Sequence, residues 1–258
     1  MGIPLEDVET RGKKALHVFA IGNDEFWAYE QCTKRMQQAL SLIDARLEMV
    51  RDLTTAESVL KGDSGAARVV LLVLPGPVPK CRTLLPWDDF FKRGGVLIIC
   101  GQFASLVRSD DADHFFANKL KLPWKIGNHF RTTDVASPAA RQILSLTSGI
   151  PDSFSNKAVR LANVASGDRL YVPGPSSRLE SSSLRDRSVD TEEPSVALTA
   201  RDAGNVAYIG DVNDEAGSAV VVKCMCEWAL GLSPGVERGP GGSGGPVSLS
   251  SSRCIPPC

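Results

Sequence analysis

The chain has 258 residues, of which 43% are hydrophobic, so it is long enough to bury the core of one large domain but short for two. Its 29 basic and 30 acidic residues give a formal net charge of −1 at pH 7, which excludes the strongly basic surface typical of nucleic-acid-binding domains. No apolar run approaches the roughly 20 residues that a membrane span needs. We therefore expect no nucleic-acid partner and no membrane segment.

The two ends of the chain differ in composition from its middle. Residues 1–14 are polar and lack the apolar stretch of a signal peptide, so we expect a flexible N-terminus. Residues 232–258 are rich in Gly, Ser and Pro, which is typical of a disordered tail. The sequence therefore predicts a single domain over residues 15–231.

The seven cysteines are an odd number and are scattered along the chain. Four of them fall within apolar segments, where a buried thiol is the common case: Cys32, Cys100, Cys224 and Cys226. Cys224 and Cys226 are two residues apart on a predicted helix, so they point to different faces and make a poor metal-binding pair. We expect a cytoplasmic protein with reduced cysteines and no metal site.

Two continuously apolar runs form the centre of the predicted fold. VVLLVLPG (residues 69–76) and VLIICG (residues 96–101) are typical of parallel strands that are covered on both faces. Residues 81–93 are long enough for a short crossover helix between them. Upstream, the pattern predicts strands at 16–21 and 47–53, a helix with a buried face after Asn23, and a short helix at 55–60. Four strands separated by helical segments predict an α/β, flavodoxin-like, doubly wound fold, with a mostly parallel sheet and helices on both faces in three layers.

The second half of the chain has weaker patterns. Helices are predicted at 110–120 and 137–146, and residues 125–134 read as an edge strand or an extended loop. Strands are predicted at 158–164, 169–172, 196–200 and 206–212. Residues 173–194 are dominated by Ser, Pro and charge, so we expect a mobile surface insertion. Asn213, Asp214 and Glu215 are expected to begin the last helix as a cap, and Gly231 to end it.

Four predicted turns follow strands and lead into helices. In an open parallel sheet such turns meet at the carboxyl edge, where ligands bind. We therefore expect the loops after the first, third, fourth and last strands to share one crevice that takes a small polar molecule. The predicted ligand-binding residues in these loops are Gly22, Asn23, Asp24, Gly76, Gly101, Gln102 and Asn213.

The sequence resembles a known superfamily at two of these turns. GGVLIICGQ (residues 94–102) and VAYIGDVNDE (residues 206–215) are similar to the class I glutamine amidotransferase-like superfamily, above all to its ThuA-like and related fungal branches. The similarity covers residues 14–231, mostly as the order and spacing of elements. It implies the same flavodoxin-like fold.

The resemblance also implies a catalytic pattern that this chain carries only in part. Active members place a cysteine in a G-x-C-x-G turn after a central strand and an H-x-E motif after the last strand. Cys100 stands at the matching strand end, but Ile98 and Gln102 occupy the glycine positions. The last turn contains Asp211, Asn213 and Glu215 and no histidine; the three histidines are His17, His114 and His129. A thiol without a base beside it is a poor nucleophile at neutral pH, so we expect Cys100 to be structural.

The acidic last turn leaves a second chemistry open. Asp211 and Glu215 are residue types that act as acid and base or hold a divalent cation through oxygen atoms. Acidic residues in the first turn of a helix also stabilise it without any catalytic role. No cofactor is expected.

Two functions therefore remain at this point. The first is a non-catalytic or divergent member, a pseudoenzyme, that binds a small polar ligand or a partner at the carboxyl edge of the sheet. The second is a divergent hydrolase-like or amidotransferase-like enzyme that acts on a small molecule through Cys100 or through the Asp211 and Glu215 carboxylates. The missing histidine favours the first.

Overall fold

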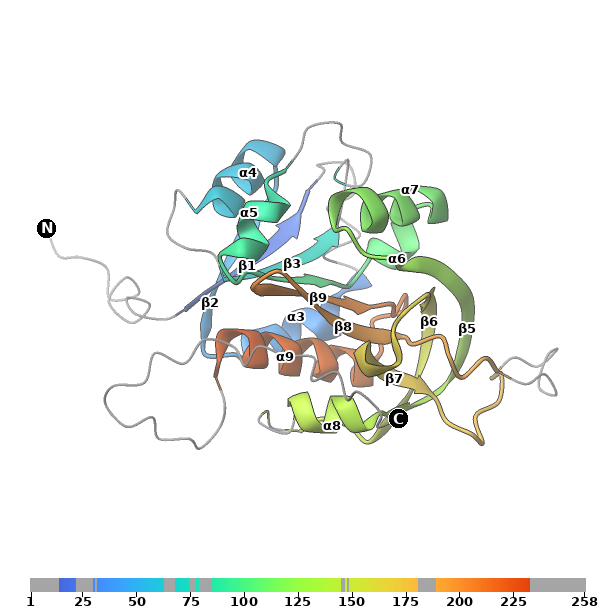
Figure 1. Cartoon of the computed structure of the whole chain (residues 1–258). Helices are drawn as coiled ribbons and strands as arrows, with labels where there is room; N and C mark the ends of the chain where they lie inside the picture. The colour runs from blue at the N-terminus through green and yellow to red at the C-terminus, as the bar shows by residue number, and fades with distance from the viewer. Residues whose placement is uncertain are drawn as a thin grey trace, which may run out of the picture.

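The computed structural model describes residues 14–21, 30, 32–62, 68–74, 78, 85–144, 147, 149–180 and 189–232. In this part of the chain nine strands form one mixed sheet, in the order β2-β1-β3-β4-β9-β8-β7-β5-β6 (Figure 1). The strands are β1 (Lys14–Ala20), β2 (Ala45–Val50), β3 (Val69–Leu74), β4 (Val96–Ile99), β5 (Lys125–Ala136), β6 (Ser153–Ala162), β7 (Arg169–Pro173), β8 (Val196–Arg201) and β9 (Gly204–Ile209).

Helices cover both faces of the sheet. They are α3 (Lys34–Ser41), α4 (Leu53–Lys61), α5 (Trp87–Lys92), α6 (Phe103–Leu106), α7 (Ser109–His114), α8 (Pro138–Leu144) and α9 (Ala216–Leu230), with a π-helical turn at Phe115–Lys119 and a 3₁₀ turn at Ser166–Asp168. Figure 1 shows α4 to α7 on one side of the sheet and α3, α8 and α9 on the other. The prediction of an α/β protein is confirmed.

The parallel half of the sheet agrees with the sequence. β1 lies between β2 and β3, β3 pairs with β4, and β4 pairs with β9, all in parallel. The apolar runs of β3 and β4 are buried on both faces, as their composition predicts. The predicted strands at 16–21, 47–53, 69–76, 96–101 and 206–212 are confirmed, with ends that differ by at most three residues.

The other half of the sheet is antiparallel, so the prediction of a mostly parallel sheet is wrong there. β9 pairs with β8, β8 with β7, β7 with β5, and β5 with β6, each antiparallel. The physical reason is visible between β8 and β9, where Asp202 and Ala203 are the only residues between the strands. Two residues cannot form the crossover that a parallel pair needs, and Asp202 adopts the positive φ of a tight turn (53°).

β5 is a strand in the interior of the sheet. The residues that the sequence assigned to an edge strand or an extended loop lie between β7 and β6, so the edge assignment is wrong. β5 is the longest strand and curves around one side of the molecule in Figure 1, with a shift in register between Ile126 and His129. Curvature of this kind is what a bulge introduces.

The antiparallel strands curl back onto the end of β9. Ala158 of β6 forms an isolated bridge with Asp211, the Val159 amide donates to the Gly210 carbonyl (2.9 Å), and the Val212 amide donates to the Lys157 carbonyl (3.0 Å). Gly210 is required at this contact, because an added Cβ would lie 1.9 Å from the Val159 carbonyl oxygen. The outer edge of β6 is thereby joined to the segment that begins the predicted site.

Each face of the sheet has its own core. One core packs α3, α8 and α9 against the sheet through residues such as Leu40 and Val222. The other is rich in aromatic rings in mutual contact, namely Trp87, Phe90, Phe91, Phe103, Phe115, Phe116, Trp124 and Tyr208. Among the described residues no helix has the length and apolar character needed to cross a membrane.

Helix ends follow local rules in most places. Asp52 caps α4 by accepting a hydrogen bond from the Thr55 amide (2.8 Å), and Gly62 ends that helix in the left-handed conformation. Gly231 ends α9 in the same way, at φ 61°, as predicted. The predicted helix at 110–120 is α7 continued by the π-helical turn. The predicted helix at 137–146 is α8.

Candidate functional site

The loops after β4 and β9 meet at the carboxyl edge of the parallel strands, as expected. Together with the start of α3 and the first turns of α9 they surround a cavity of about 20 Å³, room for about one water molecule. Its lining residues are Cys32, Met36, Gly101, Gln102, Ile209, Asp211, Asp214, Ser218, Ala219 and Val222. Three predicted site residues, Gly101, Gln102 and Asp211, are therefore brought together. Gly22, Asn23, Asp24 and Gly76 lie outside the described residues.

Cys100 lies in the core beneath this cavity. Its side chain has no exposed surface, and its sulfur contacts Met36 Sδ at 3.8 Å. Burial raises the pKa of the Cys100 thiol far above its usual value. The neighbouring Cys226 is equally buried, and its pKa is raised for the same reason. These surroundings keep both thiols protonated, which is the state of a structural cysteine.

Gly101 and Gln102 have structural roles at the same turn. Gly101 adopts φ +60°, and an added Cβ would lie 2.5 Å from Val73 Cγ1, so the turn itself requires glycine. The Gln102 side chain is buried and donates from Nε2 to the Cys32 carbonyl (3.2 Å). Gln102 thus ties the segment before α3 to the end of β4.

Asp211 organises the turn between β9 and α9. Its carboxylate accepts hydrogen bonds from the backbone amides of Asn213 (2.9 Å) and Glu215 (2.6 Å). Burial raises the pKa of Asp211, against the opposing effect of those two amides. The nearby Ser218 hydroxyl also lowers the pKa of Asp211. The Ser218 oxygen is buried and makes no hydrogen bond of normal geometry to any described residue. Asp211 is thus a carboxyl group with a raised pKa in the cavity wall.

The cap predicted for the last helix is formed differently. No side chain caps α9 at Glu215, and Asp214 instead reaches across to α3. Its carboxylate accepts from the Arg35 amide (2.5 Å) and the Met36 amide (2.9 Å), and Arg35 Nη1 donates to its carbonyl (3.0 Å). These amides belong to the first turn of α3, where the local N-cap Thr33 makes no capping hydrogen bond. Asp214 is therefore the N-terminal cap of a helix 178 residues away in the chain.

Glu215 is paired with an arginine from the antiparallel half. Arg131 of β5 donates to Glu215 Oε1, and both side chains are about a quarter exposed. The Asn213 side-chain oxygen accepts from the same guanidinium at 2.9 Å in the amide orientation that satisfies both groups. The predicted catalytic carboxylate Glu215 therefore joins β5 to the turn. It does not line the cavity.

A wider, open groove adjoins the cavity. It has a volume of about 590 Å³ and shares Cys32 and Asp214 with the cavity wall. Its other described lining residues are Lys34, Arg35, Gln38, Val212 and Asn213. Lys34, Arg35, Gln38 and Asn213 are exposed, so the groove presents an ammonium, a guanidinium and two amide side chains to solvent. Of the predicted ligand-binding residues, Asn213 lies here.

The three histidines lie on other parts of the fold. His17 is buried in β1 with Nδ1 3.1 Å from Glu48 Oε2 of β2. His114 contacts the Asn118 side chain at the end of α7 (3.0 Å). His129 is exposed on β5, opposite Val159. None of the three lines the cavity or the groove.

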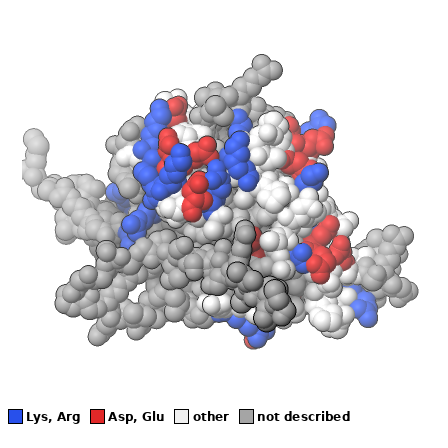
Figure 2. Space-filling model, in the orientation of Figure 1, with Lys and Arg blue, Asp and Glu red and all other residues white. Residues whose placement is uncertain are grey.

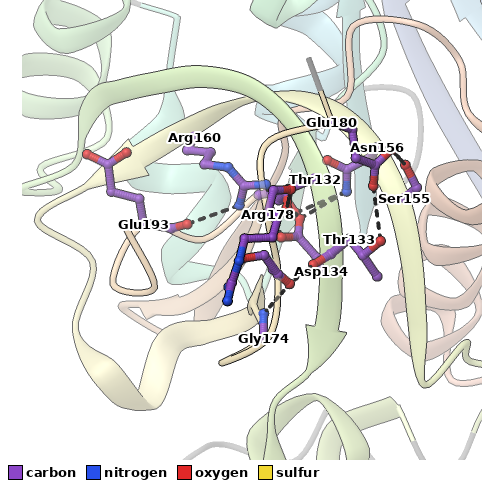
Figure 3. Close-up of polar contacts among 12 residues, drawn as sticks. Thr132, Thr133, Asp134, Ser155, Asn156, Arg160, Gly174, Arg178, Glu180 and Glu193 are labelled. Atoms are coloured by element: carbon purple, nitrogen blue, oxygen red, sulfur yellow. Dashed lines mark hydrogen bonds and ion pairs between the residues drawn. The ribbon is translucent and has the colours of Figure 1, made fainter. Parts of the chain in front are cut away.

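A second polar centre lies within the antiparallel half, and sequence reasoning missed it. The side chains of Asp134, Asn156 and Arg160 point toward one another between β5 and β6 (Figure 3). Arg160 Nη2 donates to both Asp134 oxygens (3.0 and 3.2 Å), and both side chains are completely buried. Asn156 Nδ2 (3.0 Å) and the Ser195 hydroxyl donate to Asp134 Oδ2. Both strands contain several other polar and charged residues, so no pattern in the sequence singles out this pair.

The flanks of the predicted insertion are hydrogen-bonded to β5 and β6. Thr132 Oγ1 donates to the Arg178 carbonyl (2.7 Å), and the Glu180 amide donates to the Arg131 carbonyl (3.0 Å). On the other flank, Arg160 Nη1 donates to the Glu193 carbonyl (3.2 Å). Residues 181–188 lie outside the described residues.

The described surface shows no metal cluster and no large field of one charge on the face drawn. No group of three or more His, Cys, Asp and Glu side chains among the described residues has metal-binding geometry. In Figure 2 basic and acidic side chains are interspersed over the region of α4 and α5. Interspersed charge is typical of an ordinary solvated surface.

No family model and no curated protein matches the sequence. Solved structures do match the fold. A ThuA-like protein of Bacteroides uniformis superposes with a TM-score of 0.53 and 13% identity, over 86% of this chain and 93% of that one. The chain is therefore similar in fold to a ThuA-like protein. A second ThuA-like protein, from Parabacteroides merdae, has a TM-score of 0.47 and 12% identity over 86% of this chain and 91% of that one. The β-galactosidase of Halorubrum lacusprofundi has a TM-score of 0.49 and 14% identity over 85% of this chain and 30% of that one.

The ThuA-like similarity agrees with the resemblance seen at residues 94–102 and 206–215. At 13% identity it shows the fold and assigns no residue a role. The geometry at the carboxyl edge must therefore carry any statement about function.

Proposed function

We propose that this chain is a non-catalytic binding domain with a ThuA-like, glutamine amidotransferase-like fold. It takes a small polar molecule in the groove between the first turn of α3 and the loop after β9. The observation that carries the proposal is that each candidate catalytic side chain has a structural role. Cys100 is in the core, Asp211 holds the amides of its own turn, and Glu215 is paired with Arg131.

The cavity supports this proposal through its size. About 20 Å³ does not admit a substrate beside Asp211, so its carboxyl group meets at most a water molecule. The groove is much larger, about 590 Å³, and falls within the range of small-molecule sites. Its described wall carries Lys34, Gln38 and Asn213, which donate hydrogen bonds to carboxylate or carbonyl oxygens. A small molecule rich in oxygen acceptors suits these donors.

The test is a thermal-shift screen followed by calorimetric titration. Small carboxylic acids, amides, nucleosides and sugars are compared on the wild-type protein, on a Lys34→Ala/Gln38→Ala variant, and on the control Lys125→Ala, whose exposed residue lies in β5. A ligand at 100 times its Kd stabilises the protein by about 2.7 kcal/mol, which a thermal shift detects. We expect stabilisation of the wild type and the control that is lost in the groove variant. Equal stabilisation of all three proteins contradicts the site.

The same preparation separates the alternative, an enzyme that uses Cys100 or the acidic turn. Turnover of ester or amide substrates that falls in Cys100→Ala, with unchanged thermal stability, would overturn the non-catalytic proposal. Asp211→Ala is less informative, because it removes the hydrogen bonds that hold the turn. No turnover above that of buffer supports the proposal, whereas turnover that Cys100→Ala leaves unchanged would overturn it in favour of an enzyme that uses the acidic turn.

A further inference from the structure

Exposed apolar side chains gather at one end of the sheet. The large hydrophobic residues that are exposed in the described part of the chain are Leu42, Leu47, Met49 and Leu106. Leu42 follows α3 and is 74% exposed, whereas Leu47 and Met49 lie on β2 at 40% and 36%. Two of these four side chains therefore lie on one strand, and Leu42 lies three residues before it in the chain. A grouping of this kind marks a contact surface more often than scattered residues do.

β2 is the open end of the sheet. Within the described residues it pairs with β1 on one side and has no strand on its other side. The opposite end differs, because β6 is bonded to residues 210–212. An edge strand with unpaired N–H and C=O groups is a template for another strand. β2 contains none of the proline, glycine or lysine residues that blunt such edges, since its sequence is ARLEMV.

The side chains of β2 are arranged so that the strand is complementary to itself. Leu47 and Met49 lie on the face of the core with α3, because their partners Leu16 and Val18 belong to that core. Arg46 and Glu48 lie on the opposite face, with side chains 52% and 33% exposed. Two copies of β2 that run antiparallel with Leu47 opposite Leu47 place each Arg46 opposite Glu48 of the second copy.

Neighbouring symmetric registers lack this match. A two-fold axis at Glu48 places two carboxylates opposite each other, and an axis at Arg46 places two guanidinium groups opposite each other. Like charges in directly opposed positions destabilise a strand pair, whereas opposite charges stabilise it. Of these three registers the charges therefore favour the one centred on Leu47. Within one copy Glu48 already contacts Arg46 and His17, so the dimer adds a further partner to each charge.

We propose that a second copy of this chain pairs with the free edge of β2, antiparallel and with Leu47 on the two-fold axis. The two sheets then join into one continuous sheet. Leu47 contacts its own copy across the axis, and Leu42 and Met49 are covered from the α3 side. The interface is separate from the groove, so it goes beyond the proposed function and stands or falls independently of it.

Crosslinking tests the register. In Leu47→Cys the two new thiols face each other, and a short bis-maleimide joins the subunits. In Met49→Cys the new thiol is opposite Ala45 of the second copy, and the two thiols lie about 13 Å apart along the strand, at about 3.3 Å per residue. We expect a covalent dimer for Leu47→Cys, and only the background of the wild-type protein for Met49→Cys. The reverse result would overturn the register, and crosslinking of neither variant would overturn the dimer.

Charge reversal tests complementarity, read by sedimentation velocity over a range of concentrations. Arg46→Glu turns two attractive pairs into two repulsive ones, and we expect the dimer dissociation constant to rise about tenfold. The double variant Arg46→Glu/Glu48→Arg restores opposite charges and should restore the dimer. Circular dichroism shows that each monomer is folded. A wild-type protein that stays monomeric at about 1 mM, or a dimer that Arg46→Glu leaves unchanged, refutes the proposal.

Discussion

The buried pair of Asp134 and Arg160 makes the sharpest prediction about stability. In Asp134→Asn the shape of the side chain is kept and its charge is removed. The Arg160 guanidinium then remains completely buried without a counter-ion, since its other described partners are the Glu193 carbonyl and the Phe130 ring, 4.3 Å from the guanidinium carbon. Removing one partner of a buried pair costs about 3–5 kcal/mol, because an uncompensated charge is left in the interior.

The structure places this change near the upper end of that range. Asp134 accepts from Arg160, Asn156 and Ser195, and the asparagine at position 134 turns a donor toward groups that are themselves donors. A domain of this size is stabilised by about 5–15 kcal/mol in total, so the variant loses a large share of its stability. At about 2–4 °C per kcal/mol, a loss of about 4–5 kcal/mol lowers the Tm by roughly 8–20 °C.

Urea unfolding of the wild type and three variants provides the assay. The matched control is Glu57→Gln, which removes an exposed pair with Lys61 and should cost about 0.5 kcal/mol or less. The double variant Asp134→Leu/Arg160→Met removes both charges and should cost less than Asp134→Asn alone. If Asp134→Asn costs under about 1 kcal/mol, the pair is hydrated and the reasoning from burial is refuted.

Three further changes test the turn after β9 and the core beneath it. Asp214→Ala removes the cap of α3 and should lower the free energy of unfolding, measured in urea, by about 0.5–2 kcal/mol. Asp214→Asn should lose less, because asparagine also caps helices and tolerates positive φ. Equal losses in the two variants would contradict the capping role. Burial raises the pKa of Asp211 from its ordinary value of 3.8, so the folded protein holds this proton more tightly than the unfolded chain does. Its contribution to stability is therefore complete below about pH 3.8 and is lost as the pH rises through the folded-state pKa. Asp211→Asn should remove this dependence of the unfolding free energy on pH. Parallel curves of unfolding free energy against pH for the two proteins would contradict the raised pKa. Among the described cysteines, iodoacetamide should label the partly exposed Cys32 before the buried ones, and Cys100 only as fast as the protein unfolds, as followed by mass spectrometry. Rapid labelling of Cys100 would contradict its burial.

The parallel half of the fold could be predicted because its signals are local. Val69 to Val73 and Val96 to Ile99 are buried on both faces, so their sequences are apolar throughout and need no partner to be recognised. The antiparallel half depends on pairings between distant segments. β5 has an exposed or half-buried residue at most positions, which made it look like an edge strand, but it lies between β7 and β6. Its burial comes from the curvature of the sheet and from residues near 178 and 193.

The candidate site could be located but not interpreted from the sequence. The rule that strand ends converge placed Gly101, Gln102 and Asp211 together correctly, since it depends only on the direction of the strands. The partners of these residues come from elsewhere: Cys32 for Gln102, and Arg131 for Glu215. No spacing within the sequence indicates contacts over 70 or 84 residues.

The acidic turn shows why activity loss alone would be poor evidence for catalysis in this fold. Asp211 holds the turn, Asp214 holds the first turn of α3, and Glu215 holds β5 through Arg131. Each carboxylate thus fixes a different element at the edge of the groove, and removing any one moves a wall of that groove. A variant of this turn would therefore lose ligand binding because the groove wall is displaced, even if none of the three carboxylates contacts the ligand. Lys34 and Gln38, which are exposed and have no such role in the described contacts, are the residues whose loss reports on contact with the ligand itself.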